Sequence, residues 1–168
     1  MKQKMKQAGQ TVLGVLGGMV GIFLLAASID AGSYRPAVGQ TATATIVAVA
    51  SPAATLSYPI FTAPVAAKVT LVTVTPQAAA TGNSTNTRHL NVVNKGATGA
   101  GTTEIGALDL DTGVNLVAFD ESNAAFNATY LTPGVNLAEG DVLALELEKI
   151  GTSIDLPQLS IRVEWVPR

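Results

Sequence analysis

The residues whose types and spacing could do chemistry are Asp109, Asp111 and the lone histidine, His89. In Asp109-Leu-Asp-Thr-Gly113, alternate carboxylates precede a glycine, as they do in the first half of a calcium-binding loop. The last position of such a loop requires a bidentate glutamate and would fall on Asp120, and no helix-forming pattern flanks the segment. A turn between two strands accounts for the same residues, so we expect no metal site.

We also expect no catalytic residue and no cofactor. The Asp111-Thr-Gly113 triplet occurs in aspartic proteases, but those need two such loops and this chain has one. The chain has no Gly-x-Ser-x-Gly motif that could present a serine nucleophile to His89. His89 points outward on a predicted strand, so we expect it to be an exposed or interface histidine. The chain has no cysteine and no phosphate-binding or dinucleotide-binding glycine motif. These observations predict a protein that is not an enzyme.

Composition and charge narrow the partners. The 168 residues are 48% hydrophobic and 13% charged, which excludes a disordered chain and leaves room for one compact domain with a short appendage. Lys2, Lys4 and Lys6 are the only charged residues before Asp30; from Asp30 onward there are 12 acidic and 7 basic residues, a balance of −5. An acidic domain opposes binding to phosphate backbones, so we expect no nucleic-acid partner.

The elements that must position these residues read as strands. Leu143, Leu145 and Leu147 alternate with polar residues, and Leu159, Ile161, Val163 and Trp165 do the same, as half-buried antiparallel strands do. β-branched residues dominate 68–75. The candidate strands are 41–49, 56–62, 68–75, 88–94, 103–110, 114–120, 128–132, 143–148 and 159–165. Glu146 and Glu148 share a polar face, as do Arg162 and Glu164, and we expect these two strands to pair through surface ion pairs.

We therefore predict an all-β fold, an antiparallel, jelly-roll-like β-sandwich of about 8–9 strands over residues 41–168. Turn-forming residues fill 81–87, 95–102, 120–127 and 132–134. A Gly-, Pro- and Ser-containing linker covers 30–40, and one hydrophobic α-helix preceded by a basic patch covers 1–29.

The apolar segment 12–29 has three interpretations. Its 18 residues would make a helix of roughly 27 Å, just long enough to span a bilayer core. It is a retained membrane anchor, an arm buried among subunits of an assembly, or a cleaved secretory signal. Its glycines form two overlapping pairs spaced by four residues, which would let helices pack closely. The candidate helix-packing residues are Gly14, Gly17, Gly18 and Gly21.

Five stretches resemble phage virion structural proteins of the small β-domain type that decorate capsids or form head fibres. They are 61–70 (FTAPVAAKVT), 86–96 (NTRHLNVVNKG), 101–103 (GTT), 113–120 (GVNLVAFD) and 137–145 (LAEGDVLAL). The resemblance implies a non-catalytic virion component that forms a homo-oligomer, for example a trimer, and contacts other coat proteins. Residues 1–29 depart from this family pattern. We expect residues 12–29 either to contact a lipid bilayer or to be embedded in the protein shell of the virion.

The expected function is therefore a capsid, coat or capsid-decoration subunit located in the virion. Two alternatives stay open. One is a β-sandwich binding module, for example for carbohydrate, anchored in a cell membrane or secreted, with its site in loops 81–87 and 120–127. The other is a filament subunit with a helical core.

Overall fold

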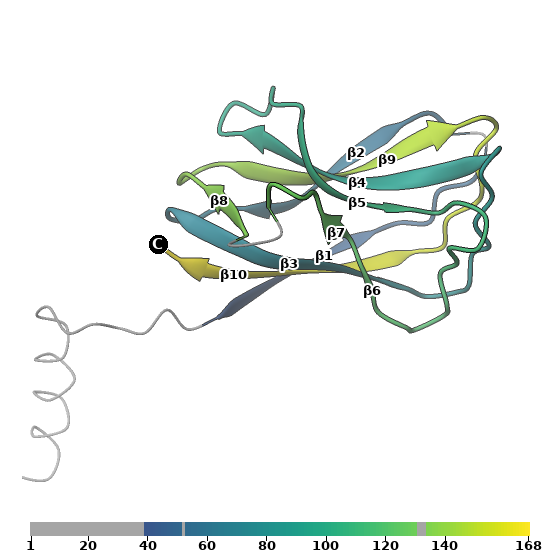
Figure 1. The fold of residues 1–168 in the computed structure, drawn as a ribbon, viewed down its shortest axis with the longest axis horizontal. Helices are drawn as coiled ribbons and strands as arrows, with labels where there is room; N and C mark the ends of the chain where they lie inside the picture. Colours follow the sequence, from purple (N-terminus) through teal and green to yellow (C-terminus); the bar gives the residue numbers. More distant parts are fainter. Residues whose placement is uncertain (1–38, 52, 131–133) are drawn as a thin grey trace, which may run out of the picture. The chain divides into compact units, whose positions relative to one another are not determined.

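The computed structural model describes residues 39–51, 53–130 and 134–168. They fold into two antiparallel sheets packed face to face (Figure 1). The predicted all-β sandwich is confirmed for these residues, which contain no helix. The predicted helix in 1–29 and most of the linker lie outside the described residues.

One sheet has the strand order β1-β10-β3-β6, with β8 also paired to β3; the other has the order β2-β9-β4-β5-β7. The strands are β1 (Gln40–Ile46), β2 (Leu56–Thr62), β3 (Ala67–Pro76), β4 (Thr87–Gly96), β5 (Thr103–Asp109), β6 (Ser122–Asn123), β7 (Ala125–Phe126), β8 (Val135–Leu137), β9 (Val142–Ile150) and β10 (Leu159–Pro167).

Alternation along each strand builds the core between the sheets. Leu143, Leu145 and Leu147 of β9 are fully buried, and so are Leu159, Ile161 and Val163 of β10. Trp165, the last inward residue of β10, packs against Phe61 of the opposite sheet, with the ring centroids 5.4 Å apart and the rings tilted by 42°. Because period-two patterns place one set of side chains on one face, the sequence was sufficient to assign these core residues.

Two predicted strands are wrong. The segment 114–120 is a loop, because only Leu116 turns inward, making an isolated bridge with Ala80, and Phe119 has a left-handed backbone (φ 60°) that no strand accommodates. Residues 128–130 form a turn. The short strands β6 and β7 lie instead in 120–127, which was expected to be a loop.

The expected pairing of the strands containing Glu146 and Arg162 is also wrong, because β9 and β10 belong to different sheets. Lys95 contacts Glu146 at 3.5 Å, whereas Arg162 contacts Glu121 and Glu164. Although β9 and β10 follow each other in sequence, residues 151–158 between them cross from one sheet to the other, so the two strands form no hairpin.

Candidate functional site

The loops at one end of the sandwich are joined to one another by many polar contacts. The registers place the ends of β1, β3, β5 and β9 and the starts of β2, β4 and β10 together. This end lies away from the marked C-terminus in Figure 1. We call it the loop end and define it by residues 47–55, 77–86, 110–121 and 151–158.

Arg88 holds two of these loops in place. Its guanidinium donates hydrogen bonds to the backbone carbonyls of Ala53 (2.9 Å), Ala54 (3.4 Å), Leu147 (3.2 Å) and Ile154 (3.4 Å). The side chain is fully buried, and this burial lowers the pKa of Arg88 from its ordinary value, partly offset by the charges of Tyr58 and Asp155. An arginine stays charged in proteins even so, so the guanidinium remains a donor to all four carbonyls.

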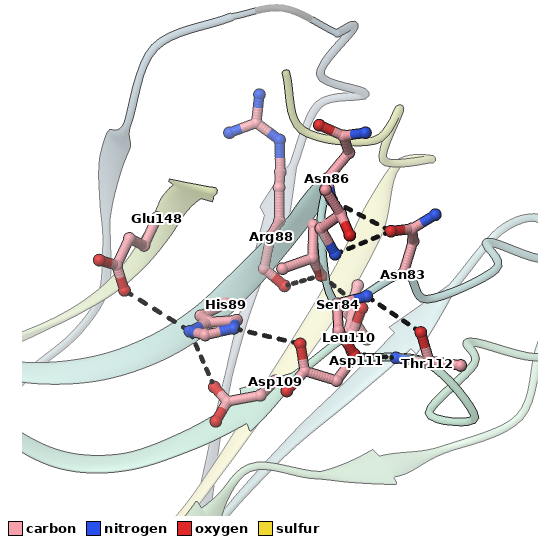
Figure 2. A network of polar contacts seen from close by, with 12 residues as sticks. Asn83, Ser84, Asn86, Arg88, His89, Asp109, Leu110, Asp111, Thr112 and Glu148 are labelled. Carbon is pink, nitrogen blue, oxygen red and sulfur yellow. Dashed lines mark hydrogen bonds and ion pairs between the residues drawn. The ribbon is translucent and has the colours of Figure 1, made fainter. Parts of the chain in front are cut away.

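Sequence reasoning missed Arg88, although a signal was present. Arg88 has the same parity as Leu90 and Val92, both fully buried. Figure 2 shows its side chain leaving β4 on the side opposite to His89. A cation that shares the parity of core residues indicates an internal hydrogen-bonding group, because a buried charge needs partners.

His89 lies among three carboxylates on the outer face of β4. Its Nδ1 is 3.5 Å from Oδ1 of Asp109 and 3.7 Å from Oε2 of Glu148, and its Nε2 is 3.6 Å from Oδ1 of Asp111 (Figure 2). The register explains two of these contacts, because His89 is paired with Asp109 on β5 and with Glu148 on β9. Asn91 donates to the same Glu148 oxygen at 3.0 Å.

This arrangement changes the interpretation of both sequence candidates. The outward direction predicted for His89 is right, but its side chain is only 25% exposed and is engaged within the chain. Asp109 faces Nδ1 of the imidazole and Asp111 faces Nε2, so the two carboxylates do not converge on one position as calcium ligands would. In the part of the chain that the structure describes, no three His, Asp or Glu side chains are placed to hold a metal ion.

Short polar side chains join loop 77–86 to loop 110–121. Ser84 and Thr112 exchange hydrogen bonds, each backbone N–H donating to the other's hydroxyl at 3.1 and 3.0 Å. The Asn83 carboxamide accepts from two following backbone N–H groups, an Asx turn, and the Thr87 hydroxyl donates to the Leu110 carbonyl (Figure 2). Gly82 allows the close approach of the loops, because a Cβ there would lie 2.2 Å from two backbone oxygens. Loop 81–87, the candidate site of the binding-module alternative, is therefore held in place by hydrogen bonds to loop 110–121.

Four of the five exposed large hydrophobic residues in the described part of the chain lie at the loop end. They are Val47 (63% exposed), Val114 (40%), Val117 (56%) and Phe119 (78%). The backbone N–H of Phe119 donates to the Pro76 carbonyl at 2.8 Å, which holds the aromatic residue in its left-handed conformation. A bulky residue in this conformation costs of order 1–3 kcal/mol and persists only when its surroundings impose it.

A polar cavity of about 270 Å³ lies on the outer face of the β2-β9-β4-β5-β7 sheet. It is lined by Thr55, Asn91, Val93, Thr102, Glu104, Glu146 and Glu148. Glu146 is paired with Lys95, and Glu148 with His89 and Asn91. These carboxylates therefore already have partners within the chain.

The predicted helix-packing residues Gly14, Gly17, Gly18 and Gly21 lie outside the described residues. Within residues 39–51, 53–130 and 134–168, no helix has the length and apolar character needed to cross a membrane. The anchor hypothesis for residues 12–29 stays a prediction.

Comparison with known proteins yields a distant likeness. No family model and no curated protein matches the chain. Among solved structures, a chain described as "Cyanophage Pam1 capsid asymmetric unit" is similar at 18% identity and a TM-score of 0.40, covering 83% of this chain and 95% of that chain.

Proposed function

We propose that the chain is a non-enzymatic structural subunit of a phage virion. It is a capsid, coat or capsid-decoration protein that self-assembles through its β-sandwich, with residues 12–29 embedded in a membrane or in the shell. The observation that carries the proposal is the exposure of Val47, Val117 and Phe119 at the loop end, where hydrogen bonds within the chain hold the loops.

Exposed apolar side chains on hydrogen-bonded loops favour binding to another protein over catalysis. Exposed hydrophobic groups make a free monomer prone to association, whereas in an assembly their burial supplies binding energy. Because the loops are already held by Arg88, Ser84 and Thr112, little conformational entropy is lost when a partner binds. A neighbouring coat protein is the partner class that fits a preformed, non-catalytic surface.

The sandwich is of the jelly-roll type, by inference from its connections. The strands β1, β3 and β10 lie in one sheet and β2, β4 and β9 in the other, so that the chain crosses between the sheets at each step from β1 to β4 and again from β9 to β10. This alternation is characteristic of the double Greek key that occurs in many viral capsid domains. It supports a coat role by analogy of architecture only.

The substitution Phe119→Asn tests the proposal. Asparagine accepts a left-handed backbone more readily than phenylalanine, so the isolated protein is expected to unfold at the same temperature or a higher one. Incorporation into particles, measured as the chain-to-capsid ratio after gradient purification, is expected to fall. The matched control is Val65→Asn, an exposed apolar residue outside the loop end (43% exposed), which should leave incorporation unchanged. Full incorporation of the Phe119→Asn protein would contradict docking through this loop.

The binding-module alternative draws on the position of loop 81–87 at the loop end. It makes a different prediction for the gradient fractions that contain the purified particles. A carbohydrate-binding module would be absent from purified particles and would be retained on a glycan surface, whereas a coat subunit would co-sediment with the particles.

A further inference from the structure

The edge strand β1 differs from every other sheet edge of the described residues. Natural sheets protect their edges with proline, bulges, charged residues or very short strands. At the far edges, β6 and β7 have two residues each and β8 has three. The remaining edge, β2, contains Pro59 and a register shift between Pro59 and Phe61. Each of these edges therefore resists pairing with another chain.

Strand β1 has none of these devices. It pairs with β10 over seven residues without a register shift, and Thr41 to Thr45 contains no proline and no charge. Thr41, Thr43 and Thr45 are exposed, whereas Ala42 and Ala44 are half-buried against the core. In the described residues, β10 is its only strand neighbour. Among the described residues, the other side of Thr41–Thr45 is a regular edge on which a further strand could pair.

The sequence of this edge identifies the strand that fits it. Thr41-Ala-Thr-Ala-Thr45 reads the same in both directions about Thr43. When two copies pair antiparallel around a twofold axis at Thr43, threonine faces threonine and alanine faces alanine at every position. Thr–Thr pairs are among the favourable cross-strand neighbours, and a self-complementary surface is what a twofold contact requires.

We propose that β1 pairs antiparallel with β1 of a second copy, centred on Thr43, which joins two sandwiches through one continuous sheet. The inference rests on the proposed function for its biological setting, since it names the edge through which a coat subunit associates with its own kind. The paired alanines Ala42 and Ala44 would be covered further on the inner face, and the threonines would form a row on the outer face.

Single cysteines test the register, because the native chain has none. Facing residues of an antiparallel pair have Cα atoms about 4.5–5.5 Å apart, which suits a disulfide. Full-length protein carrying Thr43→Cys, mildly oxidised in detergent, is expected to run as a covalent dimer on a non-reducing gel. Thr41→Cys should not cross-link with itself, because two copies of that residue would lie about 14 Å apart. Mixing the Thr41→Cys and Thr45→Cys proteins should restore the dimer.

Charge substitutions give an independent measurement. Thr43→Lys places two lysines face to face and is expected to shift the protein toward monomer in analytical ultracentrifugation. The control Ser160→Lys adds the same charge on an exposed position one strand further in, and should leave the dimer intact. An equimolar mixture of Thr43→Lys and Thr43→Glu proteins should recover dimer, which also shows that both variants fold.

Absence of the Thr43→Cys dimer, equal cross-linking at positions 41 and 43, or no recovery in the lysine–glutamate mixture would each overturn the edge pairing. These outcomes are separate from failure of the coat role. A chain that incorporates into particles but does not cross-link refutes only the edge pairing. A chain that cross-links but is absent from particles refutes only the coat role.

Discussion

Arg88 illustrates at the residue scale how one side chain organises loops that are distant in sequence. Its guanidinium binds carbonyls of residues 53 and 54 before β2, of Leu147 on β9, and of Ile154 after it. Hydrogen bonds from a charged group contribute more than neutral ones, and a buried carbonyl that loses its donor adds a desolvation cost. The loop end therefore depends on a residue that is not itself on the surface.

Replacing Arg88 by methionine keeps most of the buried volume and removes all four hydrogen bonds. We expect the free energy of unfolding to fall by about 3 kcal/mol. The measurement is the shift of the urea unfolding midpoint, with the dependence of the unfolding free energy on urea concentration unchanged. Arg162→Met is the control, because that guanidinium is 37% exposed in its ion pair and should contribute about 1 kcal/mol or less. Equal midpoint shifts in the two variants would show that the carbonyl contacts of Arg88 are unimportant.

At the element scale, Glu121 attaches the loop before β6 to β3 and β10. Its carboxylate accepts from the buried Thr73 hydroxyl on β3 and from two nitrogens of Arg162 on β10, at 2.9 and 2.8 Å. The hydrogen bond from Thr73, with a further contribution from Arg162, lowers the pKa of Glu121 below its ordinary 4.5. A lowered pKa in the folded state means that the folded protein binds this proton less readily than the unfolded chain does.

The stabilisation from Glu121 is therefore complete above the ordinary pKa of 4.5 and is lost as the pH falls through the lowered folded-state value. We expect Glu121→Gln to lower the melting temperature by a constant amount at neutral pH, and this difference from the wild type to shrink below pH 4.5. Calorimetry across the acid range measures it. Thr73→Val should reproduce part of the effect. A difference that stays constant into strong acid would contradict the linkage.

At the scale of the whole molecule, the three interpretations of residues 12–29 predict different contacts for this segment. If helices pack through the glycine pairs, Gly14→Ile or Gly18→Ile is expected to reduce incorporation into particles, because the added side chain separates the helix backbones. Ala26→Ile at the far end of the segment is the control.

Intact mass of the native chain, together with gradients run with and without detergent, distinguishes the three interpretations. Loss of a full-length chain with detergent indicates lipid, resistance indicates a protein arm, and a mass starting near Ser28 indicates cleavage.

The sequence by itself determined the fold class, most strand positions and the inward faces of β4, β9 and β10. Hydrophobic alternation is local, and it directly encodes which side chains are buried. It failed at 114–120, where β-forming residues fill a loop, since propensity does not register the contact between Phe119 and Pro76.

Only the tertiary structure decided which strands pair and which side chains meet. The carboxylates around His89 come from β5, its following loop and β9, and the partners of Arg88 come from three segments. The pairing of β1 with β10 left a regular, uncharged edge that no local pattern marks as an edge. Such contacts depend on register and on crossovers between sheets, which are set by the energy of the whole core and not by any short stretch of residues.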